Sequence, residues 1–123
     1  MPKKILIAED NDFNLRVVEL VLKAHGYETV AAPDGQKAVE LAKSEKPDLV
    51  LMDLQMPTMD GITATKLIKN DEQTHDIPVV ALTAHAMEDD EDRALAAGCD
   101  GYITKPIDTR LLPKQLEGFM KNK

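Results

Sequence analysis

The stretch Leu49-Val50-Leu51-Met52-Asp53 decides the fold, because four consecutive apolar side chains end at a single carboxylate. Two other runs have the same character: Ile5–Ala8 ends at Glu9, and Val79–Leu82 ends at Thr83. Apolar residues that are continuous rather than alternating are typical of strands buried on both faces. The stretch therefore predicts a central strand of a parallel sheet that is covered by helices on both sides.

Weaker strand patterns at Glu28–Ala31 and Gly101–Thr104 bring the expected number of strands to five, and a less regular helix is expected around Ala86–Ala97. Asp34 and Asp108 are suited to cap helices that follow them. Right-handed crossovers between successive βα units then predict an α/β, doubly wound (βα)5 fold. The apolar faces of the other four expected helices are Val17, Val18, Val21 and Leu22; Ala38, Val39 and Ala42; Ala64, Leu67 and Ile68; and Leu112, Leu116, Phe119 and Met120.

Composition restricts the function classes. A chain of 123 residues is near the roughly 150 residues expected of one domain. The net charge of -7 and the pI of about 4.9 argue against a nucleic-acid binder. No stretch approaches the roughly 20 apolar residues that a membrane span needs. The single cysteine, Cys99, excludes an internal disulfide and is compatible with the reducing cytoplasm, where we expect the protein to act.

Acidic residues follow two strands that we expect to be neighbours in the sheet. Glu9 and Asp10 follow the first strand, and Asp53 follows the third. Two bare charges about 6 Å apart at an effective dielectric constant of about 20 repel each other by roughly 3 kcal/mol. Mg²⁺ prefers such oxygen ligands, and Mn²⁺ accepts the same ones. The carboxyl ends of the strands, where ligands bind in this class of fold, are therefore expected to hold a divalent cation.

Several motifs in the chain resemble the receiver domain of bacterial response regulators. The resemblance covers essentially the whole chain, in order and with typical spacing. The motifs are Glu9-Asp10, Leu51-Met52-Asp53-Leu54-Gln55-Met56-Pro57, Asp60-Gly61, Ala81-Leu82-Thr83-Ala84 and Tyr102-Ile103-Thr104-Lys105-Pro106.

This resemblance implies a flavodoxin-like sheet with the strand order 2-1-3-4-5 and a site that accepts a phosphoryl group. Asp53 resembles the phosphorylated aspartate, and Thr83 and Lys105 resemble the hydroxyl and the cation that bind the phosphoryl group. The expected Mg²⁺ ligands are Glu9, Asp10, Asp53 and the backbone carbonyl of Gln55.

The resemblance also implies a switch. Thr83 is expected to move toward the phosphoryl group and to leave space for Tyr102 to rotate inward. The change would alter the face formed by the fourth helix, the fifth strand and the fifth helix. A cis peptide bond between Lys105 and Pro106 would aim the lysine into the acidic site.

The expected phosphodonor is a phosphohistidine on a sensor kinase or a phosphotransfer protein. The chain would catalyse only its own phosphorylation and dephosphorylation and so is not expected to be an enzyme in the usual sense. Helical periodicity does not decide which of Leu15 and Val18 faces outward. The group expected to dock the partner is Phe13, Asn14, Leu15, Val18, Pro106 and Ile107.

Within the family, the segments Ala8–Asn14 and Gly98–Tyr102 resemble single-domain regulators of the DivK and CheY type and the receivers of hybrid kinases. We expect residues 1–123 to form one receiver domain without an output domain; an excised hybrid-kinase receiver is the alternative. The expected state is a monomer that can dimerise transiently. Cell-cycle control, a phosphorelay shuttle and motility control all remain open pathways.

Two other functions on related folds fit less well. A phosphatase of the haloacid-dehalogenase type would need a second aspartate two residues after its nucleophile, where this chain has Gln55. A flavin-binding electron carrier would need a phosphate loop rich in glycine and hydroxyl groups after the first strand. The acidic segment Glu9–Asp12 would repel a flavin phosphate.

Overall fold

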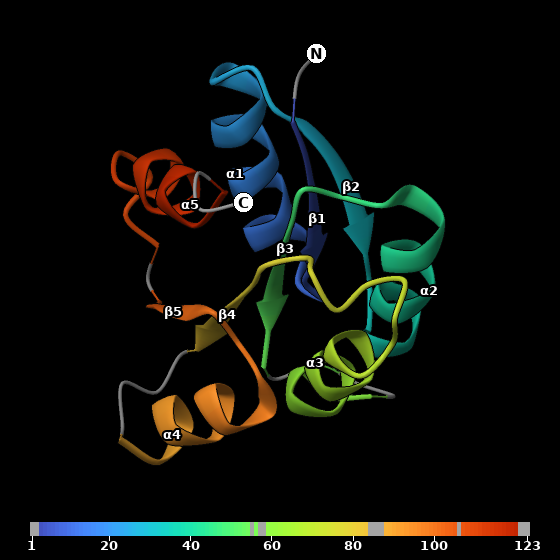
Figure 1. The fold of residues 1–123 in the computed structure, drawn as a ribbon. Coiled ribbons are helices and arrows are strands. Elements are labelled where there is room, and N and C mark those ends of the chain that lie inside the picture. Colours follow the sequence, from blue (N-terminus) through green and yellow to red (C-terminus); the bar gives the residue numbers. More distant parts are fainter. Residues whose placement is uncertain (1–2, 55, 57–58, 84–87, 106, 121–123) are drawn as a thin grey trace.

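The structure is a computed structural model that describes residues 3–54, 56, 59–83, 88–105 and 107–120. Strands and helices alternate along the chain (Figure 1). The strands are β1 (Lys4–Ala8), β2 (Glu28–Ala32), β3 (Leu49–Asp53), β4 (Val79–Thr83) and β5 (Gly101–Thr104). The helices are α1 (Asp12–Ala24), α2 (Gly35–Glu45), α3 (Gly61–Lys69), α4 (Glu88–Ala97) and α5 (Leu112–Met120).

The strands form one parallel sheet in the order β2-β1-β3-β4-β5. This order confirms the predicted flavodoxin-like α/β fold. Because β1 pairs directly with β3, with Ala8 opposite Met52, the residues that follow these two strands lie at the same edge of the sheet. The predicted neighbourhood of the two acidic strand ends is therefore confirmed.

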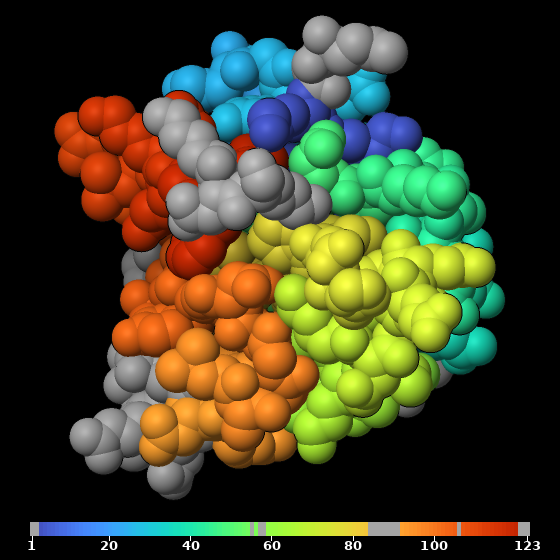
Figure 2. All heavy atoms as spheres, viewed as in Figure 1, coloured from blue at the N-terminus to red at the C-terminus, as the bar shows by residue number. Residues whose placement is uncertain are grey.

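Helices cover both faces of the sheet, and alternate strand residues point to the two sides. On one side, Ile5 and Leu51 share a core cluster with residues of α1 and α5. On the other side, Leu6 and Met52 share a cluster with residues of α2, α3 and α4. Figure 2 shows the side chains of α3 and α4 in contact on this second side. Burial on both faces explains why the strand sequences are continuously apolar.

The element boundaries follow the predicted signals with one correction. The Asp34 side chain caps α2 by accepting a hydrogen bond from the backbone N–H of Lys37 (2.8 Å). Asp108 does not cap the last helix, because α5 begins only at Leu112. The Asp108 side chain instead accepts from the backbone N–H of Arg110 (3.0 Å), in the turn before that helix. None of the described helices is long and apolar enough to cross a membrane.

Candidate functional site

Three carboxylates meet at the carboxyl end of the sheet. Glu9 and Asp10 follow β1, Asp53 is the last residue of β3, and each offers an oxygen within 4.8 Å of the other two. Glu9 and Asp53 are each only 2% exposed, whereas Asp10 is open to solvent. The cluster thus combines two carboxylates inside the protein with one at its surface. Oxygen ligands in this arrangement suit a hard divalent cation.

One cation from a distant part of the chain enters this cluster. The Lys105 Nζ donates a hydrogen bond to Asp53 Oδ2 (3.0 Å) and lies 3.5 Å from Glu9 Oε1. The Lys105 backbone N–H donates to the Thr83 carbonyl (2.8 Å), which anchors the start of the loop after β5 to β4. Burial lowers the pKa of Lys105, but its hydrogen bond to Asp53 and the charges of both acids outweigh this effect and raise it. Lys105 is therefore held in its charged form.

Glu9 is the electrostatically strained member of the cluster. Burial, reinforced by the neighbouring Asp53 carboxylate, raises the pKa of Glu9 to about 7, although the Asn14 side chain and Lys105 act in the opposite direction. Both Glu9 carboxylate oxygens are buried and accept no hydrogen bond from the described residues, although the Lys105 ammonium lies 3.5 Å from Oε1. Buried carboxylate oxygens without a hydrogen bond are costly, and binding a cation would relieve the cost.

The remaining site residues lie on β4 and β5. Thr83 ends β4 and is buried, and the preceding Leu82 pairs with Asp53 across the sheet. Tyr102 lies on the edge strand β5 opposite Ala81 and is 39% exposed. The hydroxyl side chain of Thr83 is thus at the same sheet edge as Asp53, and Tyr102 is one strand further out. Tyr102 is thus exposed in this structure, and its coupling to Thr83 stays a prediction.

The group predicted to dock a partner is only partly at the surface. Phe13 at the start of α1 is 74% exposed, and Asn14 is half-buried. The prediction is wrong for Val18, which is 1% exposed and belongs to the core between α1 and the sheet. Leu15 and Ile107 are half-buried and pack against that same core cluster.

Sequence reasoning missed Leu20, which is 71% exposed on α1. Phe13, Val17 and Leu20 follow the spacing i, i+4, i+7 and therefore share one face of the helix, on which Phe13 and Leu20 are exposed and Val17 is half-buried. This spacing was visible in the sequence, but α1 has a second apolar stripe that includes Val18 and Leu22, and only burial distinguishes the two. Two predicted site residues lie outside the described residues. They are Gln55, predicted as a metal ligand, and Pro106, predicted as a docking residue that follows a cis peptide bond.

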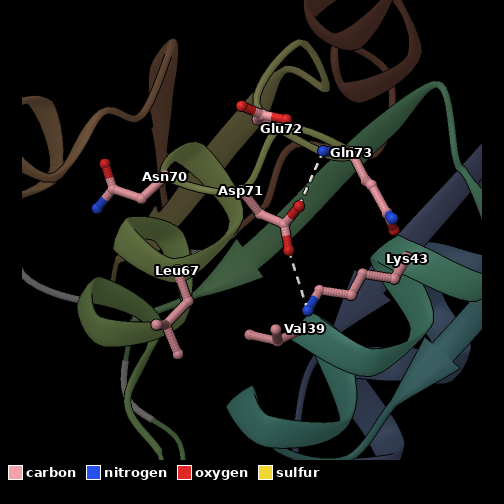
Figure 3. A pocket seen from close by; sticks show the side chains of 7 residues that line it. All are labelled: Val39, Lys43, Leu67, Asn70, Asp71, Glu72 and Gln73. Carbon is pink, nitrogen blue, oxygen red and sulfur yellow. Dashed lines mark hydrogen bonds and ion pairs between the residues drawn. The ribbon is translucent and has the colours of Figure 1, made fainter.

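Two other features lie away from the carboxylates. A hollow of about 590 Å³ lies between α2 and α3, crossed by the ion pair of Lys43 with Asp71 (2.9 Å; Figure 3). It is lined by Val39, Lys43, Leu67, Asn70, Asp71, Glu72 and Gln73. None of these lining residues belongs to the acidic cluster.

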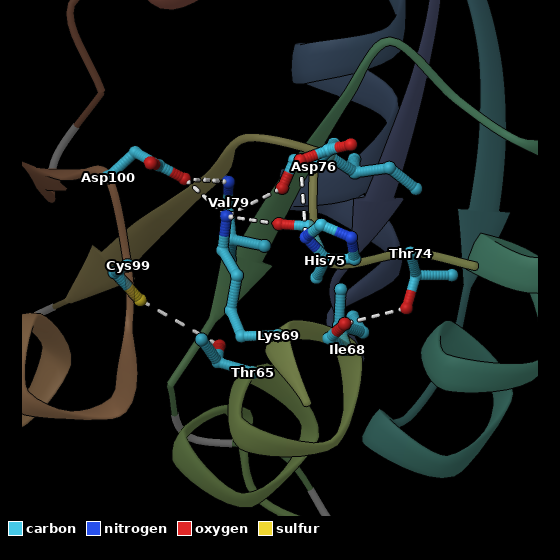
Figure 4. A network of polar contacts seen from close by, with 10 residues as sticks. Thr65, Ile68, Lys69, Thr74, His75, Asp76, Val79, Cys99 and Asp100 are labelled. Atoms are coloured by element: carbon cyan, nitrogen blue, oxygen red, sulfur yellow. Dashed lines mark hydrogen bonds and ion pairs between the residues drawn. The ribbon is translucent and has the colours of Figure 1, made fainter. Parts of the chain in front are cut away.

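A polar network connects α3 to the segments that precede β4 and β5 (Figure 4). Lys69 Nζ donates to the Ile77 carbonyl and to Asp100 Oδ2, both at 2.8 Å. Cys99 is buried beside Thr65, with its sulfur 3.7 Å from the Thr65 hydroxyl, and burial raises the pKa of its thiol. None of these contacts involves a residue of the acidic cluster, so we assign them a structural role. A buried thiol with a raised pKa is unreactive, so Cys99 is also assigned a structural role.

Comparison with known proteins identifies the family to which the chain is similar. Residues 5–117 match the sequence model of the family described as "Response regulator receiver domain". The polar-differentiation response regulator DivK of Brucella anthropi is 40% identical over 120 residues, which are 98% of each chain.

Two solved receiver domains also resemble the structure. The first is that of the sensor histidine kinase PA1611 from Pseudomonas aeruginosa, solved with a magnesium ion coordinated in its active-site cleft. Its TM-score is 0.92 at 35% identity, over 98% of this chain and 99% of that chain. The second is that of the Saccharomyces cerevisiae response regulator Ssk1, solved with the histidine phosphotransfer protein Ypd1. Its TM-score is 0.89 at 32% identity, over 98% and 90% of the two chains.

Proposed function

The chain belongs to the response regulator receiver domain family, and from this premise we propose that it accepts a phosphoryl group on Asp53 from a phosphohistidine of a sensor kinase or phosphotransfer protein. One observation carries the proposal: Asp53 is a buried strand-end carboxylate that is paired with a lysine and clustered with two further acids. Members of this family are signalling proteins rather than classical enzymes. The relative DivK makes control of cell polarity or of the cell cycle the pathway we favour.

The residues of the cluster fit a magnesium ion. Two observations support this: the buried Glu9 oxygens accept no hydrogen bond from the described residues, and the three carboxylates each offer an oxygen within 4.8 Å of the others. Asp10 and Asp53 would hold the ion, with Glu9 beside them; the Gln55 carbonyl remains a predicted fourth protein ligand. When bound, the cation supplies positive charge against the oxygens of the incoming phosphoryl group.

Asp53 would act as the nucleophile. One of its carboxylate oxygens forms a bond to phosphorus while the bond from phosphorus to the histidine nitrogen breaks, and the imidazole leaves with that electron pair. A protein catalyses phosphoryl transfer mainly by positioning the reactants and by stabilising negative charge. Lys105 is therefore expected to contribute through its positive charge, which already lies beside Asp53. The Lys105 ammonium group, which is hydrogen-bonded to Asp53 in the free protein, would bind the negatively charged oxygens of the transferred phosphoryl group. The Thr83 hydroxyl would donate a hydrogen bond to one of these oxygens.

The proposed output is a rearrangement next to the site. Thr83 is buried at the end of β4, so a movement of its side chain toward a phosphoryl group vacates space inside the protein. Tyr102 on β5 is half-exposed and can rotate into that space. The rearrangement would change the surface over α4, β5 and α5, where a downstream partner can distinguish the two states.

The proposed docking surface is the outward face of α1, formed by Phe13, Val17 and Leu20, together with Ile107 in the loop after β5. A partly exposed apolar stripe at helical spacing can pack into a groove of a helical partner. The likeness to the Ssk1 receiver domain, which was solved with a histidine phosphotransfer protein, supports a phosphodonor of that kind.

The experiment that tests the proposal is labelling with phosphoramidate as a small phosphodonor. We expect the wild-type chain to gain one phosphoryl group with Mg²⁺ present and to gain none when EDTA is added. A protein that gains no phosphoryl group under either condition, while remaining folded, would overturn the proposed function. Labelling that is equal with and without Mg²⁺ would overturn the metal assignment alone.

A further inference from the structure

Gly35, the first residue of α2, touches the loop that leads from β3 to α3. A Cβ atom at Gly35 would overlap the Met59 carbonyl oxygen and would lie 2.9 Å from the Met59 carbonyl carbon and 3.1 Å from its Cβ. Real Cβ atoms essentially never come within 3.0 Å of another residue's backbone, as the first two of these contacts would require. A backbone carbonyl cannot rotate away as a side chain can, so one of the two segments would have to move.

No other feature of the described local structure requires a glycine at this position. Gly35 does not have the positive φ of Gly26 and Gly98. Within helices in general, alanine is a better helix former than glycine. The preceding Asp34 already caps the helix. The close approach of Met59 is therefore the physical reason for a glycine here.

Two residues beyond Met59, a second glycine continues the same chain of contacts to the phosphorylation site. A Cβ at Gly61 would overlap the Asp53 carbonyl oxygen and would lie 2.8 Å from the Leu54 Cα. The Gly61 N–H also donates a hydrogen bond to the Leu54 carbonyl (3.2 Å). Met59 thus contacts Gly35 on one side, and Gly61, two residues later, packs directly against the backbone of Asp53.

The loop, not the helix, would yield to an added atom at Gly35. Helix α2 is fixed by Ala38 and Ala42, which are completely buried against the sheet, and by its cap at Asp34. A displaced Met59 therefore shifts Gly61 and, through it, the acceptor aspartate. Misplacing a reacting group by about 1 Å costs on the order of a hundredfold in rate.

We propose that Gly35 is a positioning residue for phosphorylation: its bare Cα sets the place of Met59 and, through Gly61, that of the Asp53 carboxylate. The proposal rests on the proposed function of Asp53. It adds that the start of α2, a helix that supplies none of the acidic, lysine or threonine groups, controls how fast the site reacts.

The test compares Gly35→Ala with Gly118→Ala. Gly118 lies within α5, and a Cβ there would meet no described atom within 4 Å, so it is a matched control. We expect Gly35→Ala to be labelled by phosphoramidate about ten- to a hundredfold more slowly, per folded molecule, than wild type. We expect Gly118→Ala to be labelled at the wild-type rate.

A second readout needs neither metal nor phosphodonor. Backbone amide chemical shifts of the metal-free proteins should change at Asp53 and Gly61 in Gly35→Ala and should stay unchanged there in Gly118→Ala. A variant that is merely less stable would keep the wild-type shifts in its folded fraction. Wild-type labelling rates and wild-type shifts in Gly35→Ala would overturn the inference. Absence of labelling in the wild type would instead overturn the proposed function.

A pair of variants at Met59 tests the contact without adding atoms, should Gly35→Ala not fold. Met59→Gly frees the backbone at the contact by about 0.5–1 kcal/mol and should slow labelling by about two- to fivefold. Met59→Ala removes the side chain but keeps the backbone restricted, and it should be labelled like the wild type. Equal rates for Met59→Gly and Met59→Ala would overturn the inference.

Discussion

The Lys105 Nζ lies 3.0 Å from Asp53 Oδ2, so the cation is already paired with the carboxylate that we propose as the phosphoryl acceptor. The lysine is 22% exposed at its side chain and the aspartate 4%, so water screens this pair only in part. Two more acids share the site, and Lys105 also lies 3.5 Å from Glu9. The ion pair therefore holds together a cluster that its own charges would otherwise push apart.

We predict that Lys105→Met lowers the free energy of unfolding by about 1–3 kcal/mol in EDTA, because it leaves the carboxylates without their cation. Urea denaturation with and without Mg²⁺ measures the effect. Mg²⁺ should restore more stability to Lys105→Met than it adds to the wild type. Lys105→Arg, which keeps the charge, is the control, and an unchanged stability of Lys105→Met would contradict the role given to the pair.

The pKa of Glu9 predicts an unusual dependence of stability on pH. Because this pKa is about 7 in the folded protein, against an ordinary value of 4.5, the folded state holds the proton more tightly than the unfolded state. The metal-free protein should therefore lose stability as the pH rises from 4.5 to 7 through this group. Urea denaturation of wild type and Glu9→Gln across this pH window tests the prediction. The difference between their free energies of unfolding should become smaller as the pH falls, because Glu9 is then uncharged like glutamine.

The same proton competes with the metal. Mg²⁺ affinity should increase as the pH rises toward 7 and should level off above it, because Glu9 then carries its full charge. Calorimetric titration at several pH values measures this. A wild-type affinity as independent of pH as that of Glu9→Gln would rule out Glu9 as part of the metal site.

Asp10 should show opposite effects on stability and on metal binding. Asp10→Asn removes one of three clustered negative charges, so the metal-free protein should gain up to about 1 kcal/mol, since this carboxylate is exposed. Mg²⁺ should bind at least about tenfold more weakly, which is the loss typical even of residues that only support a metal ligand. Wild-type Mg²⁺ affinity in Asp10→Asn would show that Asp10 is not a ligand.

Thr83→Ala should separate phosphorylation from its consequence. The variant keeps Asp53 and Lys105 and should still be labelled, more slowly, because one hydrogen bond to the phosphoryl group is lost. The amide shifts that labelling produces at Tyr102 in the wild type should be absent. If they persist in Thr83→Ala, the two residues are not coupled in the way we propose.

The outward face of α1 can be tested with two donors. Leu20→Asp changes a side chain that is 71% exposed, so the fold should tolerate it. Labelling by phosphoramidate should stay at the wild-type rate, while transfer from a phosphorylated histidine phosphotransfer protein should slow. Val18→Asp is the contrasting variant, because it places a charge in the core and should unfold the protein. Equal transfer to Leu20→Asp and wild type would place the docking surface elsewhere.

The sheet and the acidic site could be predicted because both depend on short, local signals. Continuous apolar runs mark buried strands, and parallel strands bring the residues that follow them to one edge, so Glu9 and Asp53 had to be close. Val18 could not be assigned uniquely in the same way, because its spacing fits both the apolar face of α1 and the predicted docking group, and only burial decides between them. The contact of Gly35 with Met59 joins segments distant in the chain and leaves no periodic trace.

The most direct test of the account is the place of the phosphoryl group. Wild type, Asp53→Asn and Asp76→Asn are incubated with phosphoramidate and Mg²⁺, and their intact masses are compared; Asp76 is a surface carboxylate with 90% of its side chain exposed. We predict that wild type and Asp76→Asn each gain one phosphoryl group and that folded Asp53→Asn gains none. Labelling of Asp53→Asn at the wild-type rate would contradict the assignment of Asp53 as the acceptor.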